Sequence, residues 1–352
     1  MPNFDSFTYR TAPWENFKHP LVRDIAWLLA SPALLSGASH NQIAPTLAPF
    51  NQPLCNAALN WLTELEHNPS LFGDLNRSNF RRLGLYAEAL FAFICSKPTP
   101  FHSFTLLAKN LQIEKLGKTY GELDFLLRSN SNQIHHLEMA VKFYLYHPQT
   151  PLPDSQTNLF YRGANRLIGP NRKDRLDLKL KRMQEHQLPI VRTPEAKQAF
   201  LNANLSVNTL SSHLLINGRI FLPGHKSEMH TNSQLQHTPL ASFVNDNIST
   251  GIWLPLSEFE QYAQTTQTKS CDVRWIVLRK LDWLAGPAAD EQLLAYAMSY
   301  EDLQTRINIG GDLDFTLPIL LQAINCERTP EGPNITKQEQ VMLVDDRWPN
   351  HL

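Results

Sequence analysis

GELDFLL (residues 121–127) and HHLEMAVKF (residues 135–143) are the two segments that decide the fold, and Ser129-Asn130-Ser131-Asn132 lies between them. Both segments are rich in aromatic and branched residues, which are typical of β-strands. Ser and Asn side chains bond to nearby backbone and tolerate turn conformations, so the intervening residues predict a tight turn. The sequence therefore predicts a β-hairpin.

Each predicted strand sorts its side chains by polarity, because neighbouring residues of a strand point to opposite faces. On the first strand Leu123, Phe125 and Leu127 share one face, and Glu122 and Asp124 share the other. On the second strand the apolar set is Leu137, Met139, Val141 and Phe143, and the other set is His136, Glu138, Ala140 and Lys142. One face of the hairpin is therefore expected to be apolar and the other polar.

A turn centred near Ser131 places Asp124 opposite Glu138. Facing residues of paired strands have Cβ atoms roughly 4.5 to 5.5 Å apart. Two carboxylates at that distance repel each other unless a proton or a cation lies between them, and oxygen ligands suit Mg²⁺ or Mn²⁺. The hairpin thus predicts a metal site at Asp124 and Glu138.

Lys142 follows on the same face, about 13 Å in rise from Glu138, so its side chain would have to fold back to reach the metal. Phosphodiester hydrolysis needs a cation that polarises the phosphoryl group and a positive group near the developing charge. Two acids and a lysine supply both. The alternative is an ordinary amphipathic hairpin whose polar face is solvated.

Helical spacing of apolar residues precedes the hairpin at 21–29, 57–65 and 83–94, and a further strand is expected at 103–113. After Gly169-Pro170-Asn171, residues 172–188 have a helical stripe of Leu176, Leu180 and Met183. The predicted order is helix, three strands, helix.

This arrangement resembles the PD-(D/E)XK nucleases, in which Glu-x-Asp on one strand and Glu with a following Lys on the next form the active site. That core is restriction-endonuclease-like: helix, three strands, helix, strand, with a mixed sheet between helices. More narrowly, LEMAVKFYL (residues 137–145), Gly169-Pro170-Asn171 and His186-Gln187-Leu188 resemble a bacterial family catalogued as domain of unknown function 1853.

The resemblance implies that Asp124 and Glu138 bind Mg²⁺ or Mn²⁺, that Lys142 is the catalytic lysine, and that Glu88 is the acid contributed by the first helix. It also implies that a nucleic acid, DNA or RNA, is the substrate. The superfamily usually has its lysine two residues after the second acid, where this chain has Ala140. That departure leaves open a catalytically inactive nuclease-fold module that binds nucleic acid or a protein.

A basic segment accompanies the predicted site. Residues 162–182 contain eight Lys or Arg against two Asp, although the whole chain has a formal net charge of -1. Phosphate contacts supply most sequence-independent affinity, so we expect this segment to bind the nucleic-acid backbone. The alternative is a solvated helix face with Asp/Lys pairing. The expected contacts are Arg162, Arg166, Arg172, Lys173, Lys179 and Arg182.

The remaining sequence is less informative about function. Four separated cysteines without metal-binding spacing favour reduced thiols and a cytoplasmic protein, and no stretch predicts a signal peptide or a membrane span. We expect strands at 214–222, 275–283, 315–324 and 340–344, and helices near 195–201 and 290–302. The predicted organisation is an N-terminal helical segment (1–80), an α/β PD-(D/E)XK-like core (81–205), and an α+β region (206–352) that selects the substrate or a protein partner.

Overall fold

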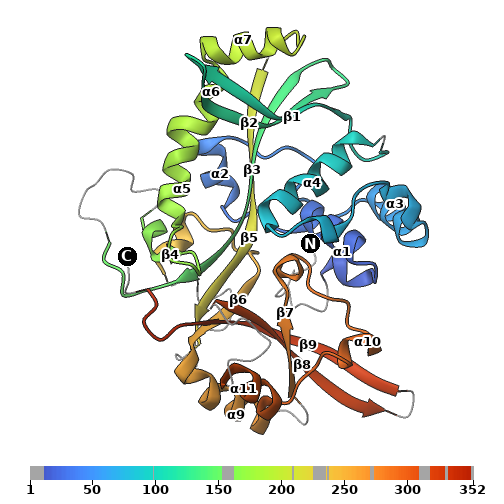
Figure 1. The fold of residues 1–352 in the computed structure, drawn as a ribbon, viewed down its shortest axis with the longest axis vertical. Coiled ribbons are helices and arrows are strands. Elements are labelled where there is room, and N and C mark those ends of the chain that lie inside the picture. The colour runs from blue at the N-terminus through green and yellow to red at the C-terminus, as the bar shows by residue number, and fades with distance from the viewer. Residues whose placement is uncertain are drawn as a thin grey trace, which may run out of the picture.

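The computed structural model describes residues 12–97, 99–152, 162–207, 210–224, 235, 238–269, 273–308, 318–329 and 332–349. The chain folds as a mixed α/β protein whose sheet is flanked by helices (Figure 1). Among the described helices, none combines the length and apolar character that a transmembrane segment requires. Cys55, Cys95 and Cys326 are free thiols, and Cys271 lies outside the described residues.

The elements up to residue 205 follow the predicted order. The N-terminal helices are α1 (Pro20–Ala30), α2 (Gly37–Ile43), α3 (Asn56–His67) and α4 (Leu83–Ser96). The strands that follow are β1 (Phe104–Lys115), β2 (Lys118–Ser129), β3 (Ile134–Tyr146) and β4 (Leu167–Ile168). Then come α5 (Leu176–Arg182), a π-helical turn (Met183–Gln187), α6 (Leu188–Ile190) and α7 (Pro194–Asn202). The helix predicted at 172–188 thus begins four residues after its predicted start. The Gly169 N–H donates a hydrogen bond to the Asp174 carbonyl, and the turn that this bond closes precedes the helix.

The described part of the second half adds further strands and helices. These are β5 (Leu210–Pro223), β6 (Thr250–Pro255), α9 (Phe259–Lys269), β7 (Val273–Leu278), α10 (Glu291–Leu294), α11 (Tyr300–Asn308), β8 (Ile319–Thr329) and β9 (Gly332–Val344). The strand expected at 275–283 ends at Leu278. A 3₁₀ turn (Lys280–Trp283) follows it, and the ring of Trp283 packs against the ring of Phe143. The helix expected at 290–302 is interrupted because Met298 pairs with Trp275. Residues 315–317, the start of another expected strand, lie outside the described residues.

A single nine-stranded sheet joins both halves, in the order β1-β2-β3-β5-β6-β9-β8-β7, with β4 beside β3. Strands β1, β2 and β3 are antiparallel, whereas β3, β5, β6 and β9 are parallel. The β3–β5 ladder runs from Ile134↔Leu210 to Leu145↔Phe221, and it crosses the expected boundary at residue 205. The sheet is therefore continuous through that point.

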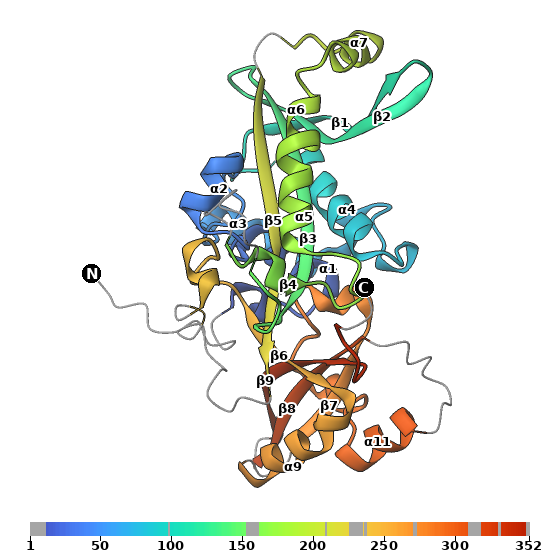
Figure 2. The ribbon, with the colours of Figure 1, turned by 90° about the vertical axis from the view of Figure 1, so that its left-hand side faces the viewer.

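Helices cover both faces of β3. Helix α4 packs on the face of Leu137, Met139 and Phe143, with α1 and α3 farther out in the same cluster, while α5 packs on the face of Ala140 and Tyr144 (Figures 1 and 2). The predicted apolar face is thus buried. Leu123 is buried as well, but it packs in a second cluster with Ile190, Val191 and Phe200. The face predicted to be polar is also covered, because α5 lies over it.

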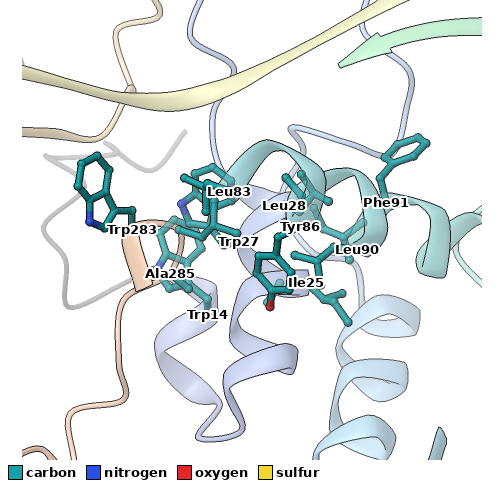
Figure 3. Packing of buried hydrophobic residues seen from close by; sticks show 14 of the residues in the cluster. Trp14, Ile25, Trp27, Leu28, Leu83, Tyr86, Leu90, Phe91, Trp283 and Ala285 are labelled. Atoms are coloured by element: carbon teal, nitrogen blue, oxygen red, sulfur yellow. The ribbon is translucent and has the colours of Figure 1, made fainter. Parts of the chain in front are cut away.

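The N-terminal core includes residues from the second half of the chain. Buried side chains of α1 and α4, among them Trp27 and Tyr86, gather with Trp283 and Ala285 in one apolar cluster (Figure 3). These contacts fix residues 280–285 beside the start of α4.

Gly218 sets the spacing between β3 and β5. It pairs with Lys142, and a Cβ atom at this position would lie 1.7 Å from the Lys142 carbonyl oxygen. We expect Gly218→Ala to lower the free energy of unfolding by about 3 kcal/mol, because the two backbones must separate. Urea unfolding measures this loss. Gly37→Ala is the matched control, since nothing lies within 4 Å of its added Cβ, and an equal loss in both variants would contradict the steric argument.

Candidate metal centre

Asp124 and Glu138 lie where β2 and β3 separate. The pairing of these strands ends at Phe125↔Leu137, which is the register that the turn at Ser131 predicts. Just beyond it, the Met139 backbone N–H donates a hydrogen bond of 2.9 Å to Asp124 Oδ2. Since Met139 directly follows Glu138, this bond holds the Asp124 carboxylate beside Glu138.

Glu138 is fully buried, so the alternative of a solvated polar face does not hold for this residue. Its Oε1 lies 3.0 Å from Nε2 of His136, which is also fully buried, and its Oε2 accepts a hydrogen bond of 2.5 Å from Gln187 Nε2. Gln187 ends the π-helical turn after α5, and its Oε1 in turn accepts a hydrogen bond of 3.0 Å from Lys179 Nζ. The π-helical turn therefore places an amide on the carboxylate of Glu138, and α5 places an amine on that amide.

Burial and like charge dominate the electrostatics of the pair. Burial and, to a smaller extent, the negative charge of Glu138 raise the pKa of Asp124 to about 7, although the Met139 N–H and Lys179 oppose the rise. Burial lowers the pKa of Lys179, as does the charge of Lys142, whereas Asp124 and Glu138 raise it. Negative charge thus accumulates in a poorly hydrated place, where a proton or a cation would relieve it.

Glu88 is a half-buried neighbour on α4. Burial raises its pKa, and Glu122 and Glu138 add to the rise, while Lys109 and Asn110 oppose it. Its Oε2 lies 3.8 Å from Lys109 Nζ. Glu88 therefore adds to the negative potential of the site, and its ion pair is with Lys109.

The donor atoms of the site suit a hydrated divalent cation. Two carboxylates fit Mg²⁺, which keeps several waters and commonly binds through one or two acids plus substrate phosphates. Within the described ranges, no cluster of three or more His, Cys, Asp or Glu side chains has an arrangement that could hold a metal ion. Asp124 and Glu138 are thus a partial donor set that fits a hydrated hard cation, and they do not form a preformed cage.

Lys142 lies away from the carboxylate pair. Its Nζ is 2.5 Å from Asp174 Oδ2, in the turn before α5, and Tyr144 Oη lies 3.5 Å from the other oxygen of Asp174. The sequence did not predict that the charge of Lys179 acts on this pair, and Lys179 was expected to bind phosphate. A signal was present: Lys179, Met183 and Gln187 recur every four residues and so lie on one side of the helix.

The basic segment divides into two groups. Arg162, Lys173 and Arg182 are exposed. Arg166 donates a hydrogen bond to the Thr150 carbonyl, and Arg172 forms an ion pair with Asp345, so these two side chains have structural contacts within the chain. The structure brings together Asp124, Glu138 and Lys179 of the predicted site residues, and it separates Lys142 from them.

The raised pKa of Asp124 predicts an unusual pH dependence of stability. With a folded pKa above the unfolded one, Asp124 favours folding below about pH 4, and this contribution is lost as pH rises to about 7. We expect Asp124→Asn, measured in chelator at pH 8, to resist urea better than wild type does. Its free energy of unfolding should be higher by up to about 4 kcal/mol. Glu114→Gln, on exposed surface, is the control; equal pH profiles for wild type and Asp124→Asn would refute the assignment.

Comparison with known proteins identifies the family of this chain. No curated protein and no solved structure matches it. A family model matches residues 23–344, which include every element from α1 to β9 apart from the first residues of α1. The chain belongs to the family described as Domain of unknown function (DUF1853).

Proposed function

We propose that this protein is a divalent-metal-dependent nuclease of the PD-(D/E)XK type, which hydrolyses phosphodiester bonds of DNA or RNA. The observation that carries the proposal is the meeting of Asp124 and Glu138 at the end of the β2–β3 pairing, next to Lys179. The element order supports it: apart from the two-residue strand β4 and the helices α6 and α7, the order α4, β1, β2, β3, α5, β5 agrees with helix, three strands, helix, strand.

Asp124 and Glu138 would hold Mg²⁺ or Mn²⁺, which would polarise a phosphoryl oxygen and lower the pKa of an attacking water. His136 and Gln187 fix the Glu138 carboxylate in one orientation through its two oxygens. A fixed orientation matters because catalytic groups that are already in place need no reorganisation as charge develops.

Lys179 is the better candidate than Lys142 for the amine of the site. Its charge acts on both Asp124 and Glu138, and Gln187 connects it to Glu138 through two hydrogen bonds. Its lowered pKa also suits a group near the reacting phosphate, since an amine with a pKa closer to neutrality transfers a proton more readily.

A second candidate function is a non-catalytic module that retains the nuclease arrangement and binds nucleic acid or a protein. The specific observation in its favour is that His136 and Gln187 already bond both oxygens of Glu138. A cation would have to replace or share those contacts. Metal binding therefore separates the two functions.

The first test is cleavage. Purified protein is incubated with labelled DNA and RNA in Mg²⁺ or Mn²⁺, and Asp124→Asn and Glu138→Gln are expected to lose at least about 10²-fold in rate because the cation is held less well. Glu114→Gln serves as the matched exposed acid. Equal, negligible cleavage by wild type and Asp124→Asn, together with no heat of Mn²⁺ binding in titration calorimetry, would refute the enzyme proposal.

The second test separates the two lysines. Lys179→Met is expected to reduce kcat by roughly 10²-fold or more with little change in metal affinity, because the lost charge acts on the transition state. Lys142→Met is expected to leave kcat within about threefold and to act mainly on KM, since Lys142 is bonded to Asp174. The reverse pattern would restore Lys142 as the lysine of the site.

A further inference from the structure

A cleft of about 840 Å³ lies beside β3, four residues beyond Glu138. Its walls come from the start of α4, from β3, from the turn before α5, and from the C-terminal half at β7, the 3₁₀ turn and β8. Both halves of the chain therefore form this cleft.

The charged side chains that line the cleft are mostly cationic. They are Arg81, Arg82, Lys142, Lys280 and Asp174. Asp174 is the one acid among these lining residues, and it is bonded to Lys142. Three positive charges thus remain in excess, in a chain whose formal net charge is -1. Such a local excess favours an anionic ligand.

The start of α4 adds to this positive potential. The helix has 14 residues, it begins at Leu83, and Leu83 and Gly84 both line the cleft. Its N-cap, Arg82, makes no side-chain cap hydrogen bond, and nothing lies within 4 Å of a Cβ built on Gly84. Free backbone N–H groups at a helix start favour phosphate, and here they lie beside two arginines.

The 3₁₀ turn supplies a further cation to the cleft. Lys280 is an exposed residue, but its Nζ lies 3.2 Å from the centroid of the Trp283 ring, and this desolvation of the amine lowers its pKa to about 8. Val141, Phe143 and Trp283 line the same cleft. A bound phosphate would favour the charged form of Lys280, because an opposite charge offsets desolvation.

The cleft and the carboxylate pair are connected. Lys142 lines the cleft, and its charge lowers the pKa of Lys179, which acts on Asp124 and Glu138. Along β3, Lys142 and Glu138 are about 13 Å apart in rise. That separation equals about four nucleotides at a rise of ~3.4 Å each.

We propose that the cleft between Arg81, Arg82, Lys142 and Lys280 binds phosphate groups of the nucleic-acid strand on which the carboxylate pair acts. This inference rests on the proposed function. It assigns phosphate binding to cations other than those of the basic segment 162–182, although the turn at 169–174 in that segment lines the cleft. It also gives Lys280, in the second half of the chain, a direct contact with substrate.

The experiment measures strand binding without cleavage. Fluorescence anisotropy with a short labelled single-stranded DNA and the matching RNA, in chelator, compares wild type with Arg81→Gln/Lys280→Gln. We expect roughly a tenfold loss of affinity for both strands, and a salt dependence of log K that is shallower by about 1.4. Arg192→Gln/Lys197→Gln removes the same charge from two exposed residues outside the cleft and is expected to bind as wild type does. Thermal unfolding checks that both double variants fold.

The outcomes separate this inference from the proposed function. Unchanged affinity in Arg81→Gln/Lys280→Gln overturns the proposal that the cleft binds the strand, even if Asp124→Asn abolishes cleavage. Loss of binding in that variant supports the cleft, even if wild type cleaves nothing in Mg²⁺ or Mn²⁺. A nucleoside monophosphate that binds as tightly as the strand, and fails to bind the double variant, would overturn strand binding in favour of a small phosphate ester.

Discussion

The parting of β2 from β3 is the constraint on which the candidate site depends. Beyond Phe125↔Leu137, the described pairing leaves β3 with β5 on one side only, until β4 joins at Leu145. An open edge inside a protein must satisfy its backbone groups in another way. Asp124 does this at Met139, and by doing so brings its carboxylate to Glu138. A single hydrogen-bonding requirement of the sheet thus explains why two acids meet in a place where burial favours neither charge.

A buried ionic network holds the two halves of the chain in register around the cleft. Arg77 lies 3.2 Å from Asp24 and 2.8 Å from Asp282, and Tyr86 donates a hydrogen bond of 2.6 Å to Asp24. Buried ion pairs contribute little net stability, but each one fixes a geometry because removing one partner is costly. Arg77 lies four residues before Arg81, and Asp282 lies two residues after Lys280. The network therefore sets the distance between the two cationic walls, and the apolar cluster of Figure 3 packs behind it.

The sequence was most informative where structure is local. The turn at Ser131 and the alternation of apolar residues predicted the register Phe125↔Leu137, because both depend on neighbours in the chain. The parallel pairing of β3 with β5 could not be predicted in the same way, since a crossover between parallel strands leaves no period in the sequence. For the same reason the sequence did not predict that strands on both sides of the expected boundary at 205 belong to one sheet. The spacing of Lys179, Met183 and Gln187 indicated which side of the helix Lys179 shares, but it could not show which lysine lies at the carboxylates. That depends on Asp174, in the turn before α5, and on Gln187, in the π-helical turn after it, and the strand pattern does not specify how this segment packs.

The packing of α5 also explains why a lysine at position 140 would be unfavourable. Ala140 is 8 % exposed and packs in one cluster with Leu176, Leu180 and Met183 of the helix and its π-helical extension. A lysine at this place would have to bury its stem and its charge under the helix, which is costly without a partner. The helix instead supplies its own amine, Lys179, through Gln187 to Glu138. Lys142, two residues farther along β3, then lies clear of the helix-covered pair and beside Asp174 at the cleft. Close helix packing thus separates the two amines, one next to the carboxylates and one next to the proposed path of the phosphates.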